Sequence, residues 1–358
     1  MEIVNICAPG YWDTADSYGI IACQMARHLA GMGVHVNAYA LGGVTFGNQD
    51  ADIRAITERP LRPALGGILL GYPTGYYRHG ALTAAGPRIA VTMFESSRIP
   101  GDWTPIMNRC DAVVTPSTFG RDIFRECGVT VPIHVIPLGI ADVYQPAPRD
   151  PNRPLTFLAF LDRGPRKGGM AALNAFVAAF GDRDDVRLIL KARNQRRMIE
   201  ITNPNVTVIM RDLTETELYM LYLSADVLIA PTTGEGFGLI PREFAATGGV
   251  ALATNWSGTA DDIDLWGVPL DYTLVPARWD SQSLAGHDLG VWAQVSRDSL
   301  IERLRDVADN RTEYTTRAAE NAQRVAAFYT WRKFAAGVWD VWKGVANGIS
   351  HRHRTLAA

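Results

Sequence analysis

Two glutamates flank a glycine-rich stretch, GEGFGLIPRE at residues 234–243, in which seven residues separate Glu235 from Glu243. The apolar run before it, ADVLIAP at residues 225–231, predicts a buried strand of a parallel sheet. The segment after it, residues 242–249, predicts a helix with a glycine stop. The stretch is therefore expected to be a strand-to-helix loop at the carboxyl end of a strand, where open α/β sheets bind ligands.

The residue types in this loop indicate the chemistry of a ligand. Gly236 and Gly238 allow the backbone to approach a ligand closely. The N–H groups of the following helical turn can hold an anion, and a carboxylate on such a helix can bind a ribose diol. A second carboxylate across the turn would face another polyol, so the pattern outlines a nucleotide sugar. A tight turn with one capping and one exposed glutamate explains the local pattern equally well.

Strands and helices alternate in both halves of the chain. The predicted strands are residues 2–8, 34–40, 88–93, 112–115, 134–137, 155–161, 186–191, 206–210 and 225–231. The predicted helices are residues 20–31, 170–180, 215–224 and 242–249. Residues 144–154, YQPAPRDPNRP, are rich in proline and predict a linker between two βα domains.

The tail has a different pattern. Residues 299–328 predict one long helix with mixed charges, and residues 330–349 predict an amphipathic helix. Trp331, Phe334, Val338 and Trp342 lie on one face of the second helix. Such an aromatic stripe is more often packed in a core than exposed to a membrane or ligand, so we expect this helix to pack on the protein.

Composition limits the function classes. A length of 358 residues favours two domains, and a net charge of −2 argues against a broad nucleic-acid footprint. The four cysteines lack metal-site spacing and are interpreted as free thiols in a reducing cytosol. No apolar run reaches membrane-spanning length, and the start of the chain lacks a signal-peptide pattern, so a cytoplasmic location is expected.

Five segments together resemble a known family. They are GEGFGL with the glutamate pair, DRGPRKGG at 162–169, SADVLIAPTTGEGFG at 224–238, DAVVTPSTFGRDIF at 111–124 with HVIPLGI at 134–140, and TNWSG at 254–258 with the late tryptophan of FYTWRKFA. In this order, they are similar to the GT-B glycosyltransferases of the retaining, nucleotide-sugar-dependent family GT4. The resemblance covers most of the chain and is loose between residues 42 and 87.

The resemblance implies an α/β fold of the GT-B type, with two Rossmann-like, doubly wound domains that face each other across a cleft. Residues 1–148 would form the acceptor domain and residues 149–330 the nucleotide-sugar domain. Residues 331–350 would form a helix that crosses back to pack on the first domain.

The resemblance also implies roles for individual residues. Glu243 would hold the ribose hydroxyls, and Glu235 would lie near the hydroxyls of the transferred sugar. The cationic pair Arg163 and Lys167 would clamp the diphosphate, with Arg166 between them as a solvated neighbour. The remaining donor-site residues are the loop Gly236, Phe237, Gly238 and Leu239, the base-contacting residues Arg211 to Leu213, and Gly19 in the first glycine loop.

The sequence departs from the family pattern in the first domain. Many relatives carry a histidine after the strand that ends near Met93, but here Phe94 occupies that place and Glu95 follows. Glu95 is interpreted either as a contact to the acceptor or donor sugar, or as a glutamate that caps the next segment or pairs with Arg98. Asp16, Ser17 and Tyr18 replace part of a glycine loop, and they would face the acceptor or cap the following helix.

The resemblance predicts a retaining transfer of a sugar from a nucleoside-diphosphate sugar to a hydroxyl acceptor, by metal-independent front-face displacement. The acceptor would be a glycan, a glycolipid precursor or a small metabolite, with no cofactor. Duplex nucleic acid is not expected as a partner, whereas peripheral membrane contact stays open. The alternatives are a GT-B sugar phosphorylase or epimerase-like enzyme and a catalytically inactive GT-B partner subunit.

Overall fold

The structure is a computed structural model that describes residues 2–9, 12, 17–41, 50–80, 85–161, 165–192 and 201–356. The chain divides into two compact units. Unit 1 comprises Met1–Phe94, Arg98–Gly139 and Thr330–Ala358, and unit 2 comprises Glu95–Ser97 and Ile140–Tyr329. The boundary predicted after Pro148 therefore falls inside unit 2, which also takes a three-residue segment from the first half of the chain.

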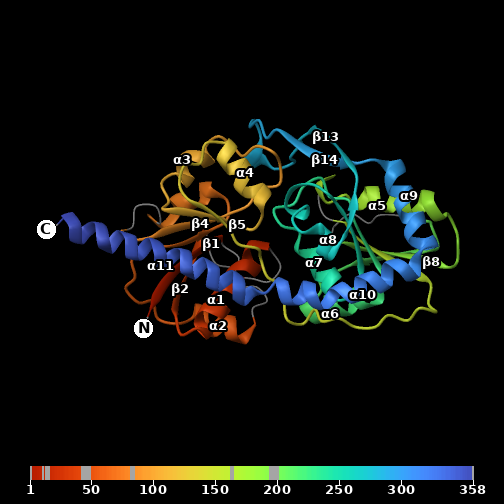
Figure 1. The fold of residues 1–358 in the computed structure, drawn as a ribbon, viewed down its shortest axis with the longest axis horizontal. Coiled ribbons are helices and arrows are strands. Elements are labelled where there is room, and N and C mark those ends of the chain that lie inside the picture. Colours follow the sequence, from red (N-terminus) through yellow and green to blue (C-terminus); the bar gives the residue numbers. More distant parts are fainter. Residues whose placement is uncertain are drawn as a thin grey trace. The chain divides into compact units, whose positions relative to one another are not determined.

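Unit 1 is built on a parallel sheet with strand order β2-β1-β3-β4-β5-β6 (Figure 1). Its strands are β1 (Ile3–Pro9), β2 (His35–Leu41), β3 (Gly67–Leu70), β4 (Arg88–Val91), β5 (Ala112–Thr115) and β6 (Ile133–Val135). Its helices include α1 (Ser17–Gly31), α2 (Ala51–Thr57), α3 (Trp103–Met107), α4 (Thr118–Glu126) and the 3₁₀ segment η1 (Pro73–Gly80). The strand order reverses between β1 and β3, as the doubly wound prediction requires.

Unit 2 repeats this arrangement with strand order β12-β11-β10-β7-β8-β9, again parallel. Its strands are β7 (Leu155–Leu161), β8 (Val186–Ala192), β9 (Val206–Met210), β10 (Val227–Ala230), β11 (Val250–Thr254) and β12 (Val268–Leu270). Flanking helices include α5 (Gly169–Phe180), α6 (Glu215–Ser224), α7 (Leu239–Ala246), α8 (Ile263–Trp266) and α9 (Arg297–Asp309). Two parallel six-stranded sheets with flanking helices confirm the predicted α/β fold of two Rossmann-like units.

Two details of unit 2 differ from the sequence prediction. The expected single helix over residues 299–328 is broken into α9 and α10 (Arg311–Phe328) at Asn310, whose backbone leaves the helical conformation and whose side chain donates to the backbone oxygen of Asp306. The helix expected from Arg242 begins earlier, at Leu239, since Pro241 is tolerated in a first turn whose N–H groups have no intrahelical partner.

An antiparallel hairpin in unit 2 was not predicted. It consists of β13 (Tyr272–Pro276) and β14 (Val291–Val295). Every residue of β13 is at least partly exposed, so the strand lacks the continuous apolar run by which the buried parallel strands were recognised. Its partner strand β14 makes hydrogen bonds to segments of the candidate functional site described below.

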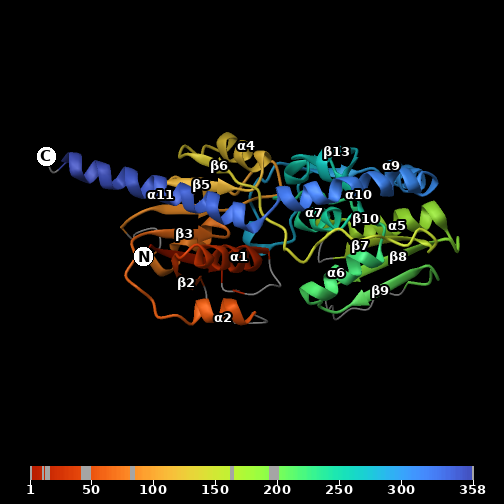
Figure 2. The same cartoon turned by 60° about the horizontal axis from the view of Figure 1, so that its bottom comes forward.

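The C-terminal helix α11 (Trp331–Leu356) belongs to unit 1, where it packs along α1, as Figures 1 and 2 show. Phe334, Ala335 and Val338 are buried on its inner face, and Trp339 stacks on Trp342. The prediction that this helix packs back on the first half of the chain is confirmed. Among the described residues, no helix is both long and apolar enough to cross a membrane.

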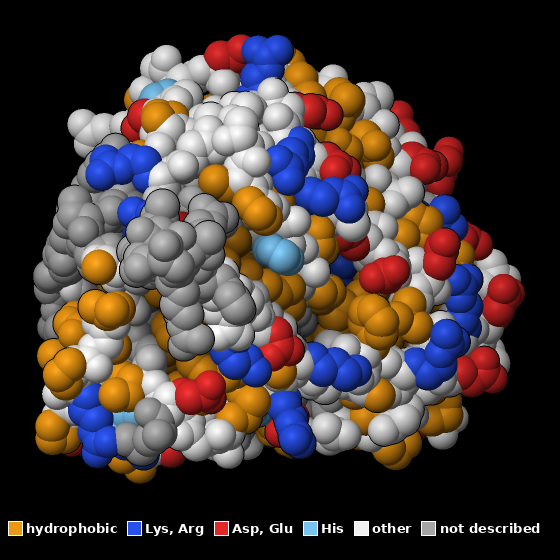
Figure 3. Space-filling model, turned by 60° about the vertical axis from the view of Figure 1, so that its left-hand side comes forward, with side chains coloured by type: hydrophobic (Ala, Val, Ile, Leu, Met, Phe, Trp, Pro, Cys, Tyr) orange, Lys and Arg blue, Asp and Glu red, His pale blue; other side chains and the backbone are white. Residues whose placement is uncertain are grey.

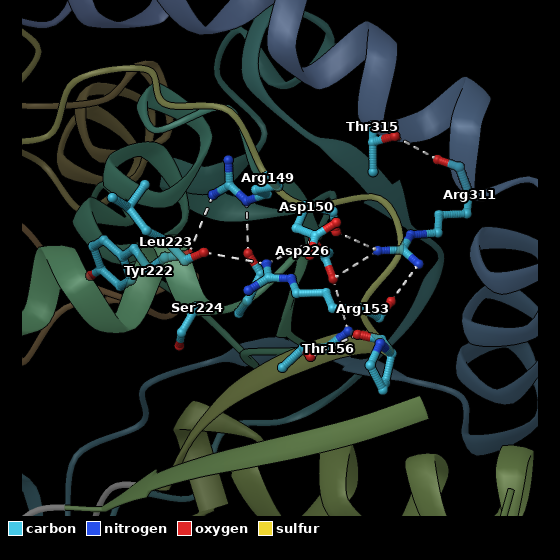
Figure 4. A network of polar contacts seen from close by, with 12 residues as sticks. Arg149, Asp150, Arg153, Thr156, Tyr222, Leu223, Ser224, Asp226, Arg311 and Thr315 are labelled. Atoms are coloured by element: carbon cyan, nitrogen blue, oxygen red, sulfur yellow. Dashed lines mark hydrogen bonds and ion pairs between the residues drawn. The ribbon is translucent and has the colours of Figure 1, made fainter. Parts of the chain in front are cut away.

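The proline-rich segment after Gly139 is anchored on unit 2 by two arginines (Figure 4). Arg149 donates to the backbone oxygens of Ala225 and Thr247, at 2.7 Å each. Arg153 pairs with the buried carboxylate of Asp226 at 2.9 Å, and Arg311 approaches the same carboxylate at 3.5 Å. Arg149 and Arg153 therefore attach the predicted linker to the rest of unit 2.

The surface charge follows the composition. On the face in Figure 3, basic and acidic side chains alternate among apolar ones, and the residues coloured there form no block of like charge. This mixed surface agrees with the net charge of −2.

Candidate functional site

The glycine-rich stretch forms the predicted turn at the carboxyl end of β10. The chain leaves β10 at Ala230, turns through the glycines and enters α7 at Leu239. Gly238 precedes the helix with φ +85°, a left-handed conformation that only glycine adopts without strain. Gly236, Phe237, Gly238 and Leu239 thus all lie in one turn, with the first N–H groups of α7 following them.

Glu235 lies buried in this turn and is paired with Lys167. The Nζ atom of Lys167 lies 2.7 Å from Oε1 and 3.0 Å from Oε2 of Glu235. The Nη1 atom of Arg166 lies 3.5 Å from Oε2. Lys167 and Arg166 come from η2 (Pro165–Lys167), directly after β7, so two neighbouring strands bring the carboxylate and the cations together.

Hydrogen bonds to the backbone hold η2 against the turn. The backbone N–H of Thr233 donates to the oxygen of Arg166 at 2.8 Å, and the side chain of Arg166 donates to the oxygen of Gly234 at 2.8 Å. Arg166 is therefore a bound member of the site, and the prediction that it is a solvated neighbour is wrong. No sequence pattern indicates these contacts, because they depend on the approach of two loops.

Glu95 joins the same cluster from a distant part of the sequence. Its Oε1 atom lies 3.8 Å from Nη2 of Arg166, and its Oε2 atom is buried without a hydrogen-bond partner. A Cβ atom on Gly234 would lie 1.9 Å from the backbone oxygen of Glu95, so only glycine allows this approach. The described ion pair of Glu95 is with Arg166, whereas one interpretation from the sequence paired it with Arg98.

The segment that carries Glu95 is fixed by β14 and the hairpin loop. The backbone of Ser97 donates to the oxygen of Val291 at 2.9 Å, and the N–H of Val291 donates to Oγ of Ser97 at 2.8 Å. The indole of Trp279 donates to Oγ of Ser96 at 3.2 Å. The hairpin therefore positions Glu95, a role that its exposed sequence pattern did not indicate.

The pKa values of the two carboxyl groups in the cluster shift in opposite directions. Burial raises the pKa of Glu235, but Lys167 and Arg166 outweigh burial and hold the pKa below its usual value. Burial also raises the pKa of Glu95, and there Arg166 and Lys167 do not outweigh burial and the neighbouring charge of Glu235. The site thus combines an ionised carboxylate with one that holds its proton more tightly.

Glu243 lies on α7 in a separate environment of tyrosines. The hydroxyl of buried Tyr222 donates to Oε2 of Glu243 at 2.9 Å, and the ring of Tyr144 packs 5.3 Å from that of Tyr222. Burial raises the pKa of Glu243 to about 7, although the hydrogen bond from Tyr222 opposes this. Tyr222 was missed by sequence reasoning, since a tyrosine inside a helix gives no signal of a carboxylate partner.

The side chain of Arg242 supports the glycine turn through hydrogen bonds. Its guanidinium is fully buried and donates to the backbone oxygens of Phe237, Gly258 and Asp261. Aromatic rings surround it, with the ring centres of Phe237 and Trp266 at 4.1 and 4.7 Å. The arginine therefore pins the turn to the loop after β11, another role that sequence reasoning missed.

The other predicted residues lie outside this cluster or outside the described residues. Arg211 is exposed and pairs with Glu217 at 2.8 Å, beside half-buried Leu213. In unit 1, Gly19 is buried in α1, and the backbone N–H of Met93 donates to the hydroxyl of Tyr18 at 3.3 Å. Asp16 and Arg163 lie outside the described residues.

Metal ligands are not clustered in the described part of the chain. Among these residues, no three His, Cys, Asp or Glu side chains lie close enough to hold one ion. Within unit 2, the structure thus brings together Lys167, Arg166, Glu235 and Glu95 beside the glycine turn, with Glu243 further along α7.

Solved structures share the fold across almost the whole chain. Sucrose-phosphate synthase from Thermosynechococcus elongatus has a TM-score of 0.69 at 14% identity, with 96% of this chain and 99% of that chain covered. A glycosyltransferase from Rickettsia africae ESF-5 has a TM-score of 0.68 at 14% identity, with 96% and 98% covered. WaaG, a glycosyltransferase involved in lipopolysaccharide biosynthesis, has a TM-score of 0.66 at 16% identity, with 95% and 100% covered.

The family assignment comes from a sequence model. No curated protein matches the chain. A family model described as Family 4 Glycosyltransferase in conflict systems matches residues 117–338, which is more than half of the chain and includes most of unit 2. The chain therefore belongs to this family of GT4-type glycosyltransferases with the GT-B fold.

Proposed function

We propose that this glycosyltransferase moves a sugar from a nucleoside-diphosphate sugar to a hydroxyl acceptor, with retention of anomeric configuration and without a metal ion. The observation that carries the proposal is the pairing of Lys167 with buried Glu235 at the glycine turn. One side of the site offers fixed cations and N–H groups for a diphosphate, and the carboxylates offer acceptors for sugar hydroxyls.

The reaction needs stabilisation of a leaving diphosphate. The bond between the anomeric carbon and the phosphate oxygen breaks, and a bond from that carbon to the acceptor oxygen forms on the same face. The acceptor proton passes to the departing phosphate oxygen, so the products are the glycoside and the nucleoside diphosphate. Negative charge grows on the phosphate in the transition state, where Lys167, Arg163 and the amides of the turn would stabilise it.

Each carboxylate has a defined task in this proposal. Glu235 is kept ionised by its cations and accepts hydrogen bonds from hydroxyls of the transferred sugar. Glu243 binds the ribose hydroxyls, with Tyr222 fixing one of its oxygens. Because the departing phosphate takes the acceptor proton, no separate general base is required.

Turnover with individual donors tests the proposal. UDP-, GDP-, ADP- and dTDP-linked sugars are incubated with the protein and candidate acceptors, and released nucleoside diphosphate is measured with and without EDTA. We expect one donor class to be consumed, with the rate unaffected by EDTA and the product anomer the same as that of the donor by NMR. Lys167→Ala should lower kcat about 100-fold, the usual cost of one transition-state donor.

Other results would contradict parts of the proposal. An inverted anomer would exclude retention, and loss of turnover in EDTA would exclude metal independence. Nucleotide binding without turnover on any acceptor would favour the inactive partner subunit. Phosphate-dependent release of a sugar phosphate would favour a phosphorylase.

A further inference from the structure

Four stretches of unit 2 meet at Gly234 and Glu235. They are the turn itself, η2, the segment Glu95–Ser97 and strand β14. The N–H of Ala293 in β14 donates to the oxygen of Thr233 at 2.9 Å, while Val291 binds Ser97. Segments far apart in the sequence are thus joined within a few residues of the predicted catalytic glutamate.

Arg166, which belongs to η2, contacts the turn, the Glu95–Ser97 segment and the loop before β14. Its Nη1 atom binds the oxygen of Gly234 at 2.8 Å and lies 3.5 Å from Glu235, while Nη2 lies 3.8 Å from Glu95. Its guanidinium lies 5.5 Å from the ring centre of Trp279, which itself binds Ser96. A planar guanidinium can donate in several directions at once, whereas an ammonium acts as a point charge.

Two carboxyl groups, those of Glu235 and Glu95, lie within ion-pair distance of Arg166. Lys167 already contacts both oxygens of Glu235. Arg166 is the described cation within ion-pair distance of Glu95, whose other oxygen, Oε2, is buried and has no hydrogen-bond partner. Removal of Arg166 would leave the Glu95 carboxyl in a buried place without its cation, which is costly.

We propose that Arg166 is a positioning residue that couples Glu95 to Glu235, so that both carboxyl groups are held to receive hydroxyls of the transferred sugar. The proposal rests on the proposed function for its catalytic consequence. In the Glu95 carboxyl, Oε1 faces Arg166 and Oε2 is buried without a hydrogen-bond partner, so the contact with Arg166 fixes this carboxyl group. Arg166 adds a second cation to Lys167 beside the Glu235 carboxylate, and its hydrogen bond fixes the backbone oxygen of Gly234.

A thermal double-mutant cycle tests the coupling without any activity assay. Wild type, Arg166→Gln, Glu95→Gln and the double variant are compared, with Arg183→Gln as the control. Arg183 lies on the same unit and pairs with Asp185 at the surface. We expect Arg166→Gln to lower Tm by about 2–4 °C, and Glu95→Gln to recover part of that loss. Strictly additive Tm changes would overturn the coupling.

The pH dependence of kcat/KM separates positioning from simple structural support. Glu235 is faced by Lys167 and Arg166 from η2 and by Glu95 from the segment after β4. Since a nearby cation favours the ionised carboxylate, Arg166→Gln should shift the acid limb upward by about one pH unit. Arg166→Lys keeps the charge, so its limb should stay near that of wild type while kcat/KM at pH 8 still falls.

An acid limb that stays in place in Arg166→Gln, with only a lower rate, would assign Arg166 a structural role and overturn the proposal. If wild type shows no turnover with any donor, the proposed function fails, and the thermal cycle still decides whether Arg166 couples the two glutamates. The two failures are therefore distinguishable.

Discussion

At the scale of single residues, the proposed role of Glu243 in nucleotide binding depends on its environment. It is half-buried on α7, accepts a hydrogen bond from Tyr222 and has its pKa raised by burial to about 7. A ribose diol donates hydrogen bonds, so the ionised carboxylate is the form that binds it best. Binding of a nucleotide should therefore compete with protonation of Glu243 near neutral pH.

This competition predicts a pH-dependent affinity. Below a pH of about 7, Glu243 of the free protein is mostly protonated, and each further pH unit lower costs about tenfold in affinity. Titration calorimetry at pH 8 and pH 6 should give a Kd about tenfold weaker at pH 6. Glu243→Gln should bind weakly at both values, and its residual pH dependence reports the phosphate of the nucleotide itself. An equal pH dependence in wild type and variant would contradict the role of Glu243.

Sequence reasoning identified the residues that stand in a motif and missed those that act through a contact. Glu235 and Glu243 were named from their spacing around glycines, and Lys167 from the family resemblance. Tyr222 was missed and Arg166 was predicted to be solvated, because their contacts arise from the approach of another element.

At the scale of elements, the glycine turn is held by buried Arg242. The guanidinium donates to backbone oxygens on two loops and lies between Phe237 and Trp266. Burial lowers the pKa of Arg242, so the cation depends on those oxygens and rings to remain charged in place. These contacts hold the turn in place, as the proposed preorganised site would require.

Arg242→Lys is therefore not a conservative change. Lysine loses the planar fork, so the variant leaves backbone oxygens unpaired in a buried site, and we expect a loss of about 3 kcal/mol in the free energy of unfolding. Urea denaturation measures this loss. Arg297→Lys is the control, since Arg297 is exposed in the first turn of α9. A variant as stable as wild type would show that Arg242 does not support the turn.

The buried strand β7 matches its predicted bounds, since burial on both faces imposes a continuous apolar run. The bounds of β9 and α6 also match their predictions. The hairpin β13–β14 was missed because exposed residues dominate β13, and the break at Asn310 was missed because a single side-chain contact causes it.

At the scale of the whole molecule, the chain starts in unit 1, passes through unit 2 and returns to unit 1 with α11. The aromatic stripe of the last helix predicted that it packs on the protein, and the family resemblance implied its return to the first domain, where α1 covers it. The first domain was predicted less completely, since residues 42–87 include α2 and β3 without a matching motif. The acceptor and the donor site are both proposals, and the proposed donor site is argued from contacts within unit 2.

The most direct test of the account is titration calorimetry of UDP, GDP, ADP and dTDP on wild type and Glu243→Ala. We expect tight binding of one nucleoside diphosphate to wild type and at least tenfold weaker binding to the variant, because a half-buried hydrogen-bonding carboxylate is lost. Absence of binding by all four nucleotides, or equal binding to wild type and variant, would contradict the proposed donor site.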